Sequence, residues 1–229
     1  MLEAHPRSSL LSDFILGSQD GIINVLGIIL GLWAAGSSER LIIVAALAAL
    51  GAESVAMAAV AFSSTLARRR LYLSELEREK REMVEVPEAE RAEVREILVN
   101  WGYQGEDLEL MLDKICSNPK AMLEFMMSFE LRLAPVPAHQ PRKSAWVVGA
   151  ATVLGHAIPI VPFFFVGSNV TLGAGLSIVL SAAALYGIGW YEARITAGIW
   201  WRRGLQMLLI GLAGGLVGYA VGVLVGAFP

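Results

Sequence analysis

Four glutamates in the middle of the chain have the spacing of a divalent-metal site. Glu79 and Glu82 are three residues apart, as are Glu90 and Glu93, so each pair lies on one face of a helix. If two helices pack across Pro87 the pairs meet, and carboxylate oxygens bind divalent cations without choosing strongly among them. The alternative is an ordinary solvated acidic surface. The same stretch carries further glutamates that need no metal: Glu75, Glu77, Glu85, Glu88 and Glu96.

A methionine pair further along the chain adds candidate soft ligands. Met126 and Met127 precede Glu130 by four and three residues, so one helical turn can present two thioethers and a carboxylate together. This mixed set fits a borderline ion such as Fe²⁺ better than Mg²⁺ or Ca²⁺. The alternative is that the methionines fill a hydrophobic core beside Phe125 and Phe129, which is the commoner use of methionine at this spacing.

Acidic residues also occur inside apolar stretches, where an ionised group is expensive and points to function. Asp13 and Asp20 are seven residues apart in the first such stretch, so they lie on one stripe of a helix. Glu53 and Met57 are four apart in the second stretch and share a helical face. Because the two helices run in opposite directions, we expect Asp20 and Met57 at similar depth on one ion pathway through the membrane.

The third apolar stretch contains His156, together with Pro159 and Pro162. A proline removes a backbone hydrogen bond, which a membrane helix tolerates where the freed carbonyl lines a cavity or finds another partner. A histidine in such a helix can relay protons or bind a metal. It can equally be hydrogen-bonded within the bundle, and the sequence leaves these roles open.

Helices that cross a membrane must position these residues. The chain has 229 residues, of which 55% are hydrophobic, and its mean hydropathy of +0.58 is too high for one soluble domain. About 20 helical residues span the hydrocarbon core, and five stretches reach this length: 13–35, 41–67, 144–167, 172–192 and 204–228. We therefore expect an all-α membrane protein with five transmembrane helices.

Positive charge falls on one side of these five stretches. Arg7 precedes the first stretch, arginines fill positions 68–70 after the second, positions 142–143 before the third are basic, and positions 202–203 before the fifth are arginines. By the positive-inside rule these segments face the cytosol. We therefore expect the N-terminus and the segment between the second and third stretches inside, and the C-terminus outside.

The segment 68–140 is a charged island in an otherwise apolar chain. It holds 15 of the 21 acidic residues and 11 basic ones. We expect a cytosolic metal-binding domain here, inserted between transmembrane helices 2 and 3. The N-terminal tail and helices 1 and 2 then occupy 1–67, and helices 3 to 5 occupy 141–229.

Within this domain the sequence predicts three or four helices. The helix of the second apolar stretch should continue to about Glu85, and Pro87 suits the first turn of the next helix. A third helix is expected at 106–116. Asn118 and the proline after it offer an N-cap and first turn for a last helix, which is predicted to run through Leu133.

Composition and charge exclude several other classes. The net charge is −3 at pH 7, and no basic excess points to nucleic acid as a partner. The single cysteine, Cys116, cannot form an intrachain disulfide, and it lacks the neighbouring Cys and His residues of a zinc-finger site, so we expect a buried helix residue. We expect no enzymatic activity, no catalytic residues and no cofactor, with metal ions and protons as substrates and the lipid bilayer as the surroundings.

Several motifs give the chain a resemblance to the vacuolar iron transporter family. The matching pieces, besides the spaced glutamates, are SQDG at 18–21, AMAA at 56–59, FMMSFE at 125–130 and RGLQMLLIG at 203–211. The resemblance covers nearly the whole chain, and its strongest part is the order in which the motifs occur. It implies a homodimer of five-span subunits whose first helices enclose the pathway, and export of cytosolic Fe²⁺ in exchange for protons.

The resemblance also implies roles for individual residues. Asp20 and Met57 look like the intramembrane metal ligands, and Asp13 lies nearer the entrance. Some family members carry a carboxylate where this chain has Ala49, and Glu53, one turn further along, is the candidate replacement. His156 is not part of the family pattern. The cytosolic metal-binding set implied by the resemblance is Glu79, Glu82, Glu90, Glu93, Met126, Met127 and Glu130.

We therefore expect proton-coupled export of cytosolic Fe²⁺, with metal collected by the cytosolic domain and passed along helices 1 and 2. Mn²⁺, Co²⁺, Ni²⁺ and Zn²⁺ accept similar ligands, so a Mn²⁺ transporter of the same family is an alternative. A membrane-anchored iron buffer and a scaffold whose acidic domain binds a basic partner are two others, although neither needs acids within the membrane. We favour a prokaryotic inner membrane as the location over a vacuolar membrane.

Overall fold

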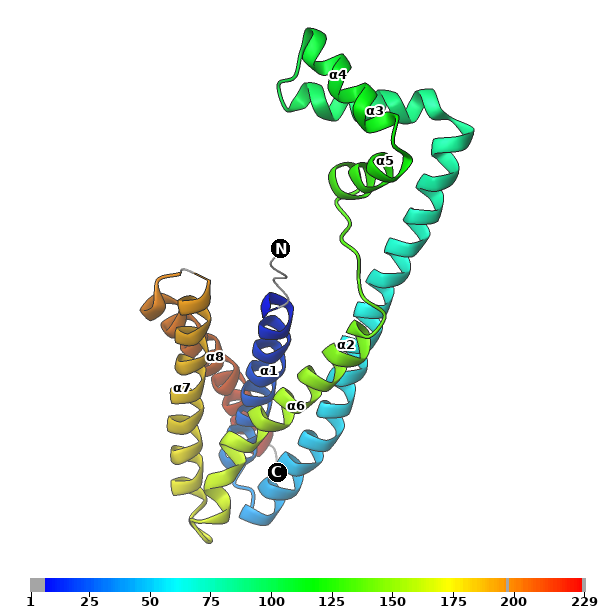
Figure 1. The fold of residues 1–229 in the computed structure, drawn as a ribbon. Helices are drawn as coiled ribbons and strands as arrows, with labels where there is room; N and C mark the ends of the chain where they lie inside the picture. Colours follow the sequence, from blue (N-terminus) through cyan, green and yellow to red (C-terminus); the bar gives the residue numbers. More distant parts are fainter. Residues whose placement is uncertain (1–6, 197, 228–229) are drawn as a thin grey trace. The chain divides into compact units, whose positions relative to one another are not determined.

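The computed structural model describes residues 7–196 and 198–227 (Figure 1). These residues form helices, turns and coil without a β-strand, which confirms the all-α prediction for the described part of the chain. Clustering of contacts divides the chain into two compact units, one of Met1–Phe62 with Arg142–Pro229 and one of Ser63–Pro141. Five helical segments are long and apolar enough to cross a membrane: Leu10–Ala34, Glu39–Glu85, Gln140–Phe164, Val170–Ile195 and Trp200–Gly226.

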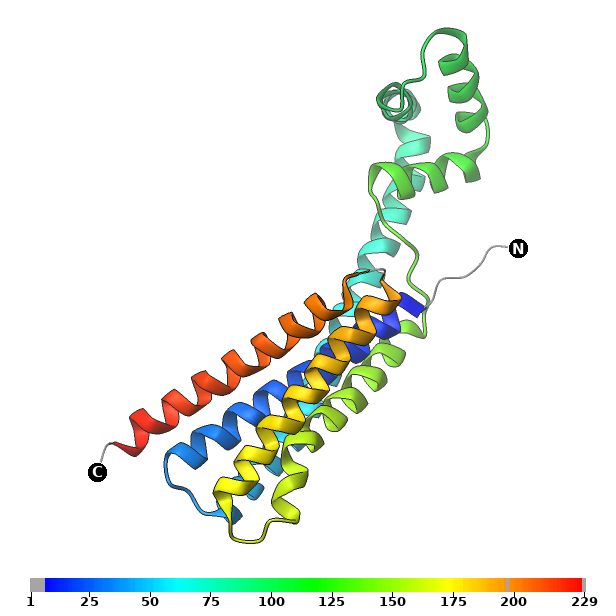
Figure 2. The same ribbon diagram turned by 90° about the vertical axis from the view of Figure 1, so that its left-hand side faces the viewer.

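The first unit is a bundle built from the five apolar segments. α8 runs beside both α1 and α7 (Figure 2). α6 passes directly after its internal Pro159 into a short 3₁₀ turn, because proline cannot continue the α-helical hydrogen bonding. The helical segments of this unit are α1 (Arg7–Ala34), the first part of α2 (Glu39–Glu85), α6 (Gln140–Ile160), η2 (Val161–Phe164), α7 (Val170–Ile195) and α8 (Trp200–Gly226).

Glycines allow α1 and α8 to touch through their backbones. A Cβ atom added at Gly218 would collide with the carbonyl of Gly27, and one added at Gly222 would collide with the carbonyl of Gly31. Small residues at helix contacts are the usual means of close packing in membranes, where apolar side chains gain little by leaving lipid. α1 is thereby fixed closely against its neighbour, which matters because it carries Asp13 and Asp20.

The second unit consists of short helices that follow the long α2. α3 (Pro87–Asn100) begins at Pro87 as predicted, and α4 (Gly105–Cys116) begins one residue before the predicted start. α5 (Pro119–Phe125) is capped by Asn118, whose side chain accepts hydrogen bonds from two backbone amides at 3.1 and 3.3 Å. The predicted N-cap is therefore confirmed.

The end of this last helix differs from the prediction. An α-helix through Leu133 was expected, but a π-helix, η1 (Met126–Glu130), follows α5, and the chain then leaves the helix with Arg132 at φ 53°. The amide of Leu131 donates to the carbonyl of Met126 at 3.1 Å, the longer-range bond that widens a helix. The wider turn places Phe129 edge-on against the ring of Trp101, with 4.8 Å between the ring centroids, and such aromatic contacts are favourable.

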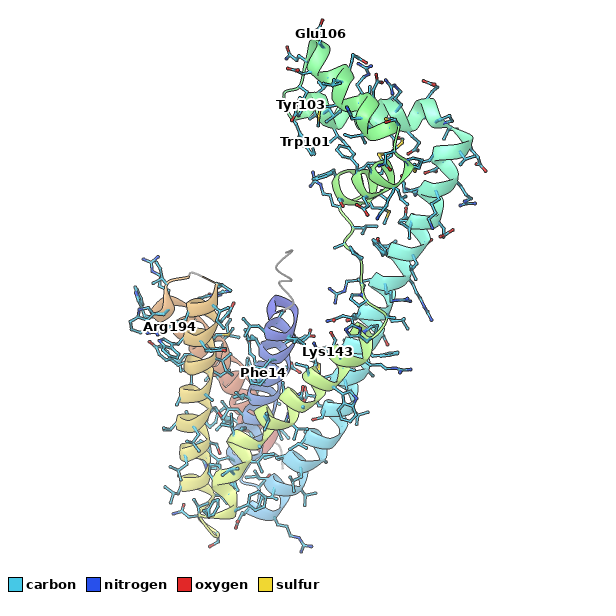
Figure 3. All side chains as sticks on the ribbon, viewed as in Figure 1. Phe14, Trp101, Tyr103, Glu106, Lys143 and Arg194 are labelled. Atoms are coloured by element: carbon cyan, nitrogen blue, oxygen red, sulfur yellow. The ribbon has the colours of Figure 1, made fainter. Side chains whose placement is uncertain are left out.

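A hydrophobic core holds the short helices together. Trp101 and Tyr103 lie in the turn between α3 and α4, with Glu106 at the start of α4 (Figure 3). The core below this turn combines residues of α3, α4, α5 and η1: Val94, Leu98, Leu108, Leu112, Met122, Phe125 and Met126. This packing fixes α3 and η1, which carry several of the predicted metal ligands.

Candidate metal sites

Three of the predicted glutamates form one cluster in the second unit. Glu79 and Glu82 lie near the end of α2, and Glu90 lies in the first turn of α3, after the break at Pro87. One carboxylate oxygen from each side chain lies within 4.8 Å of the other two. The proline break therefore brings residues of the two helices together, and three carboxylates at this separation can share one divalent cation.

Burial distinguishes this cluster from a solvated acidic surface. The exposed fraction is 1% for Glu79 and 3% for Glu90. The Oε2 atom of each is buried and has no hydrogen-bond partner among the residues that the structure describes. Burying a carboxylate oxygen without a hydrogen-bond partner is costly. A cation that binds both oxygens would remove that cost, so the residues present fit a metal.

Arg78 supplies positive charge to this cluster, and sequence reasoning missed it. Its guanidinium lies 3.6 Å from the carboxylate of Glu79, 3.4 Å from that of Glu82 and 2.9 Å from that of Glu75. The signal was present in the sequence, because Arg78 precedes Glu79 directly and lies one helical turn before Glu82. Its side chain is 43% exposed, so each of these ion pairs is weak.

The carboxylates of the cluster raise one another's pKa values. Desolvation, followed by the charges of Glu79, Glu93 and Glu130, raises the pKa of Glu90 to about 7. The pKa of Glu79 is raised as well, first by desolvation and then by Glu82, although Arg78 opposes the shift. Glu90 is therefore partly protonated near neutral pH, and a metal ion must displace its proton to bind.

Glu93 and Glu130 lie at the edge of the cluster. Both are exposed, yet desolvation and the charges of Glu93 and Glu79 raise the pKa of Glu130 to about 7. η1, which carries Glu130, packs against α3, which carries Glu93. The charges of the five predicted glutamates thus influence one another's pKa values. Three of them, Glu79, Glu82 and Glu90, have oxygens close enough to share an ion.

The two methionines of η1 differ in their surroundings. Met126 is fully buried and belongs to the hydrophobic core with Leu98 and Phe125. Met127 is 3% exposed and is not a member of that core cluster. The core interpretation therefore fits Met126, and Met127 is the better candidate for a thioether ligand.

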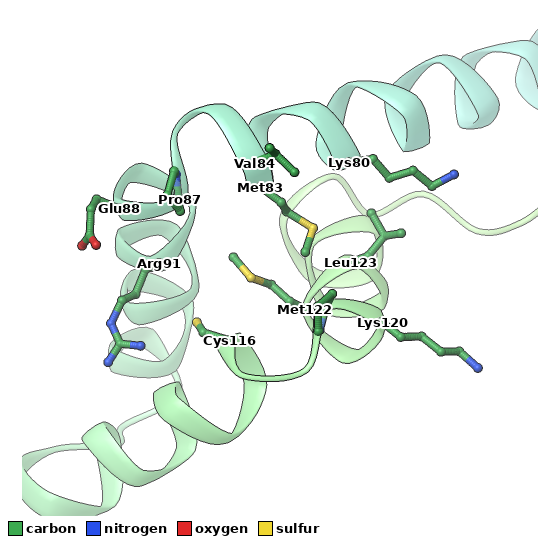
Figure 4. A pocket seen from close by; sticks show the side chains of 11 residues that line it. Lys80, Met83, Val84, Pro87, Glu88, Arg91, Cys116, Lys120, Met122 and Leu123 are labelled. Atoms are coloured by element: carbon green, nitrogen blue, oxygen red, sulfur yellow. The ribbon is translucent and has the colours of Figure 1, made fainter.

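A separate pocket of about 530 Å³ lies between α2, α3 and α5 (Figure 4). Met83, Cys116 and Met122 contribute sulfur atoms to its lining. Burial raises the pKa of the Cys116 thiol, so that it stays protonated near neutral pH. Because metal binding requires the thiolate, this pocket is a poor soft-metal site. Cys116 is the last residue of α4, as expected of a helix residue, but it is half-buried rather than buried.

A second polar group lies inside the apolar bundle of the first unit. The carboxyl of Asp20 on α1 lies close enough to that of Glu53 on α2 for the two to interact. Asn24, one turn after Asp20, donates to Oε2 of Glu53. The imidazole Nε2 of His156, on α6, lies 2.9 Å from the same oxygen. The structure therefore brings together three helices around Glu53, the candidate replacement for the carboxylate that some family members have at Ala49.

The remaining predicted residues of the pathway lie near this group without joining its hydrogen bonds. Asp13, two turns before Asp20 on α1, accepts a hydrogen bond of 2.6 Å from the Ser144 hydroxyl of α6. Met57 is half-buried and lies one turn after Glu53 on α2. The sequence paired Asp20 with Met57, whereas the residue that the structure brings into contact with Asp20 is Glu53.

Comparisons with known proteins place the chain in a family. A family model described as the VIT family matches residues 11–223. Vacuolar iron transporter 1 of Eucalyptus grandis is 30% identical over 210 residues, which cover 91% of this chain and 84% of that protein. Vacuolar iron transporter 2 of Oryza sativa subsp. japonica is 32% identical over 199 residues, covering 87% and 80%. Protein CCC1 of Saccharomyces cerevisiae is 25% identical over 190 residues, covering 82% and 58%.

Proposed function

This chain belongs to the VIT family, and we propose that it exports cytosolic Fe²⁺ across a membrane in exchange for protons. Relatives named as vacuolar iron transporters support metal transport as the general activity. Our proposal adds three points to this general activity: Fe²⁺ as the ion, export from the cytosol as the direction, and coupling to protons. We also propose a homodimer, which follows from the family resemblance, and a prokaryotic inner membrane, which is our preference from the sequence.

The observation that carries the proposal is the pair of buried, unpartnered carboxylate oxygens on Glu79 and Glu90. A cation bound by these two side chains would offset the cost of burying their oxygens. In our proposal a cytosolic Fe²⁺ ion binds there, with Glu82 as third ligand, Met127 as a soft ligand and Glu93 and Glu130 as further acidic contacts. The cluster loads the transporter.

The second step of the proposal uses the acids of the membrane helices. Asp20 and Glu53 can hydrogen-bond to each other only when one of them carries a proton, because two ionised carboxylates have no donor. A divalent cation between them removes the need for that proton. The pair can thus hold a proton or a metal ion, which is the property that exchange transport requires. Met57, one turn away, would add a thioether to the ion as it passes.

Movement of protons in response to metal tests this proposal. The full-length protein is reconstituted in liposomes, and Fe²⁺ entry and internal pH are recorded together after Fe²⁺ is added outside. Exchange transport predicts Fe²⁺ entry coupled to proton exit. A buffering protein binds Fe²⁺ without either flux, and a channel carries Fe²⁺ without proton exit, so either result would replace the proposal. Repeating the assay with Mn²⁺, Co²⁺, Ni²⁺ and Zn²⁺ identifies the preferred ion.

A further inference from the structure

His156 is the most deeply buried ionisable side chain of the apolar bundle, and the proposed transport cycle does not yet use it. Its exposed fraction is 0%. Its Nδ1 atom lies 2.8 Å from the backbone carbonyl of Thr152, one turn earlier on α6. A carbonyl only accepts hydrogen bonds, so Nδ1 carries the hydrogen and donates it. This bond fixes the orientation of the ring and directs Nε2 away from its own helix. With Nδ1 donating, the proton between Nε2 and Glu53 belongs to Glu53 when the ring is neutral and to Nε2 when the ring is doubly protonated.

The second ring nitrogen holds Glu53. Nε2 lies 2.9 Å from Oε2 of Glu53, and Asn24 donates to that same oxygen from α1. One carboxylate oxygen is thus bound from two sides, by residues of α6 and α1. The other oxygen, Oε1, takes part in neither bond and is free to face Asp20 or an ion.

The helices make room for this arrangement. A Cβ atom added at Gly21 would lie 2.6 Å from Nδ1 of His156, and one added at Gly155 would collide with the carbonyl of Ser18. α1 and α6 therefore touch at the level of the imidazole, and only a glycine at position 21 leaves space for the ring. Gly21 and Gly155 thus allow the two helices to approach closely enough to enclose the ring of His156.

We propose that His156 is a positioning residue of the transport pathway, which holds the Glu53 carboxylate against Asp20 so that both acids meet the passing ion. This inference rests on the proposed transport function. Glu53 lies on the transmembrane part of α2, where few residues are buried, and a glutamate has several rotatable bonds. Without His156 the carboxylate would keep only the hydrogen bond from Asn24 and would be held less firmly against Asp20. Partners that orient metal-binding acids commonly change affinity or activity by about 10- to 100-fold when they are removed.

A double-mutant cycle tests this role with full-length protein in liposomes. His156→Leu keeps an apolar side chain of similar size, and we expect it to lower the initial rate of Fe²⁺ entry about tenfold. Glu53→Gln should lower it at least as far. Because His156 acts through Glu53, the double variant should be no slower than Glu53→Gln alone. A packing role predicts instead that the two losses multiply, and that result would overturn the inference.

Rescue by a conservative change gives a second measurement. His156→Gln keeps an amide that can donate a hydrogen bond to Glu53 or accept one from it, so we expect its rate within about threefold of the wild type even if His156→Leu fails to fold. An equal loss in His156→Gln and His156→Leu would contradict the positioning role.

Ser181→Ala is the matched control, because Ser181 is equally buried on α7 and its hydroxyl has no partner among the described residues. If the wild type transports no Fe²⁺, the transport proposal itself is wrong. If the wild type and His156→Leu transport Fe²⁺ at the same rate, only the positioning role of His156 is wrong.

Discussion

The carboxylates of Glu79 and Glu90 approach within 4.8 Å of each other, although both side chains are almost completely buried. They come from different helices, and the break at Pro87 between these helices creates the contact. Two buried acids at this separation repel each other unless a cation or a proton lies between them. We therefore expect the stability of this unit to depend on both metal and pH.

Removal of one buried acid should weaken metal binding much more than removal of an exposed one. Glu90→Gln keeps the shape of the side chain but removes a ligand charge, and we expect a loss of about tenfold or more in affinity, equivalent to about 1.4 kcal/mol or more. Glu88→Gln, which changes the net charge equally at an exposed position of the same helix, is the control. Calorimetric titration of the full-length protein in detergent with Mn²⁺ as an air-stable probe measures both. Equal affinities in the two variants would remove Glu90 from the site.

The stability of the metal-free protein should fall as the pH rises. The folded-state pKa of Glu90 is about 7, raised from 4.5, so the folded state binds more protons than the unfolded state between these values. Glu130 adds a contribution of the same sign. The contribution is complete below about pH 4.5 and is lost as the pH passes about 7. Thermal unfolding followed by circular dichroism from pH 5 to 8 measures this slope.

Metal should reverse that slope, because a bound cation replaces the protons. A metal that binds the folded state alone stabilises it by about 2.7 kcal/mol when its free concentration is about a hundredfold above Kd. The gain should be larger at pH 8 than at pH 6, since the carboxylates are then ionised. A gain independent of pH would mean that metal binds elsewhere. Glu90→Gln should flatten the metal-free profile.

The two methionines of η1 should respond differently to replacement by leucine. Met126→Leu alters a core position with little change in volume, so we expect a loss of less than about 1.5 kcal/mol in stability and no change in metal preference. Met127→Leu removes the candidate thioether, and the preference for Co²⁺ over Mg²⁺ should fall by about tenfold. Competition titrations with the two ions give the ratio. The reverse pattern would assign the ligand to Met126.

Glycine packing in the bundle can be tested with a matched pair of alanine variants. Gly155→Ala places a methyl group against the backbone of Ser18, where nothing flexible can yield, and overpacking of this kind costs about 1–3 kcal/mol. Gly51→Ala adds the same methyl group where no atom lies within 4 Å, and it should stabilise the helix by about 0.5–1 kcal/mol. Unfolding midpoints in one detergent compare them. Equal midpoints would contradict the close contact of α1 and α6.

The sequence predicted much of this fold because local signals decide it. Uninterrupted apolar stretches predicted the five long apolar helices, while Pro87 and Asn118 predicted helix starts through a missing amide donor and a capping side chain. The π-helix at Met126–Glu130 was not predicted; it includes Phe129, which packs against Trp101 of the turn between α3 and α4. A helical period describes one helix at a time and carries no information on such contacts.

For the candidate sites, too, the sequence predicted local spacing but not the contacts between helices. Spacing indicated which glutamates share a helical face, but it did not show that Glu79 and Glu90 are buried whereas Glu93 is exposed. In the membrane helices, depth alone paired Asp20 with Met57. The contact between Asp20 and Glu53 and the bond from His156 depend on how three helices are rotated about their axes, which side-chain packing determines.

The central claim is that Asp20 binds the ion as it crosses the membrane, and Fe²⁺ flux through the Asp20→Asn variant tests it most directly. The variant and the wild type are reconstituted at equal density in liposomes that contain an Fe²⁺-sensitive dye. Equal unfolding midpoints and equal Mn²⁺ binding by the glutamate cluster show that both are intact. We predict rapid Fe²⁺ entry for the wild type and, for Asp20→Asn, a rate equal to the leak of protein-free liposomes. Unchanged Fe²⁺ entry through Asp20→Asn would contradict the account.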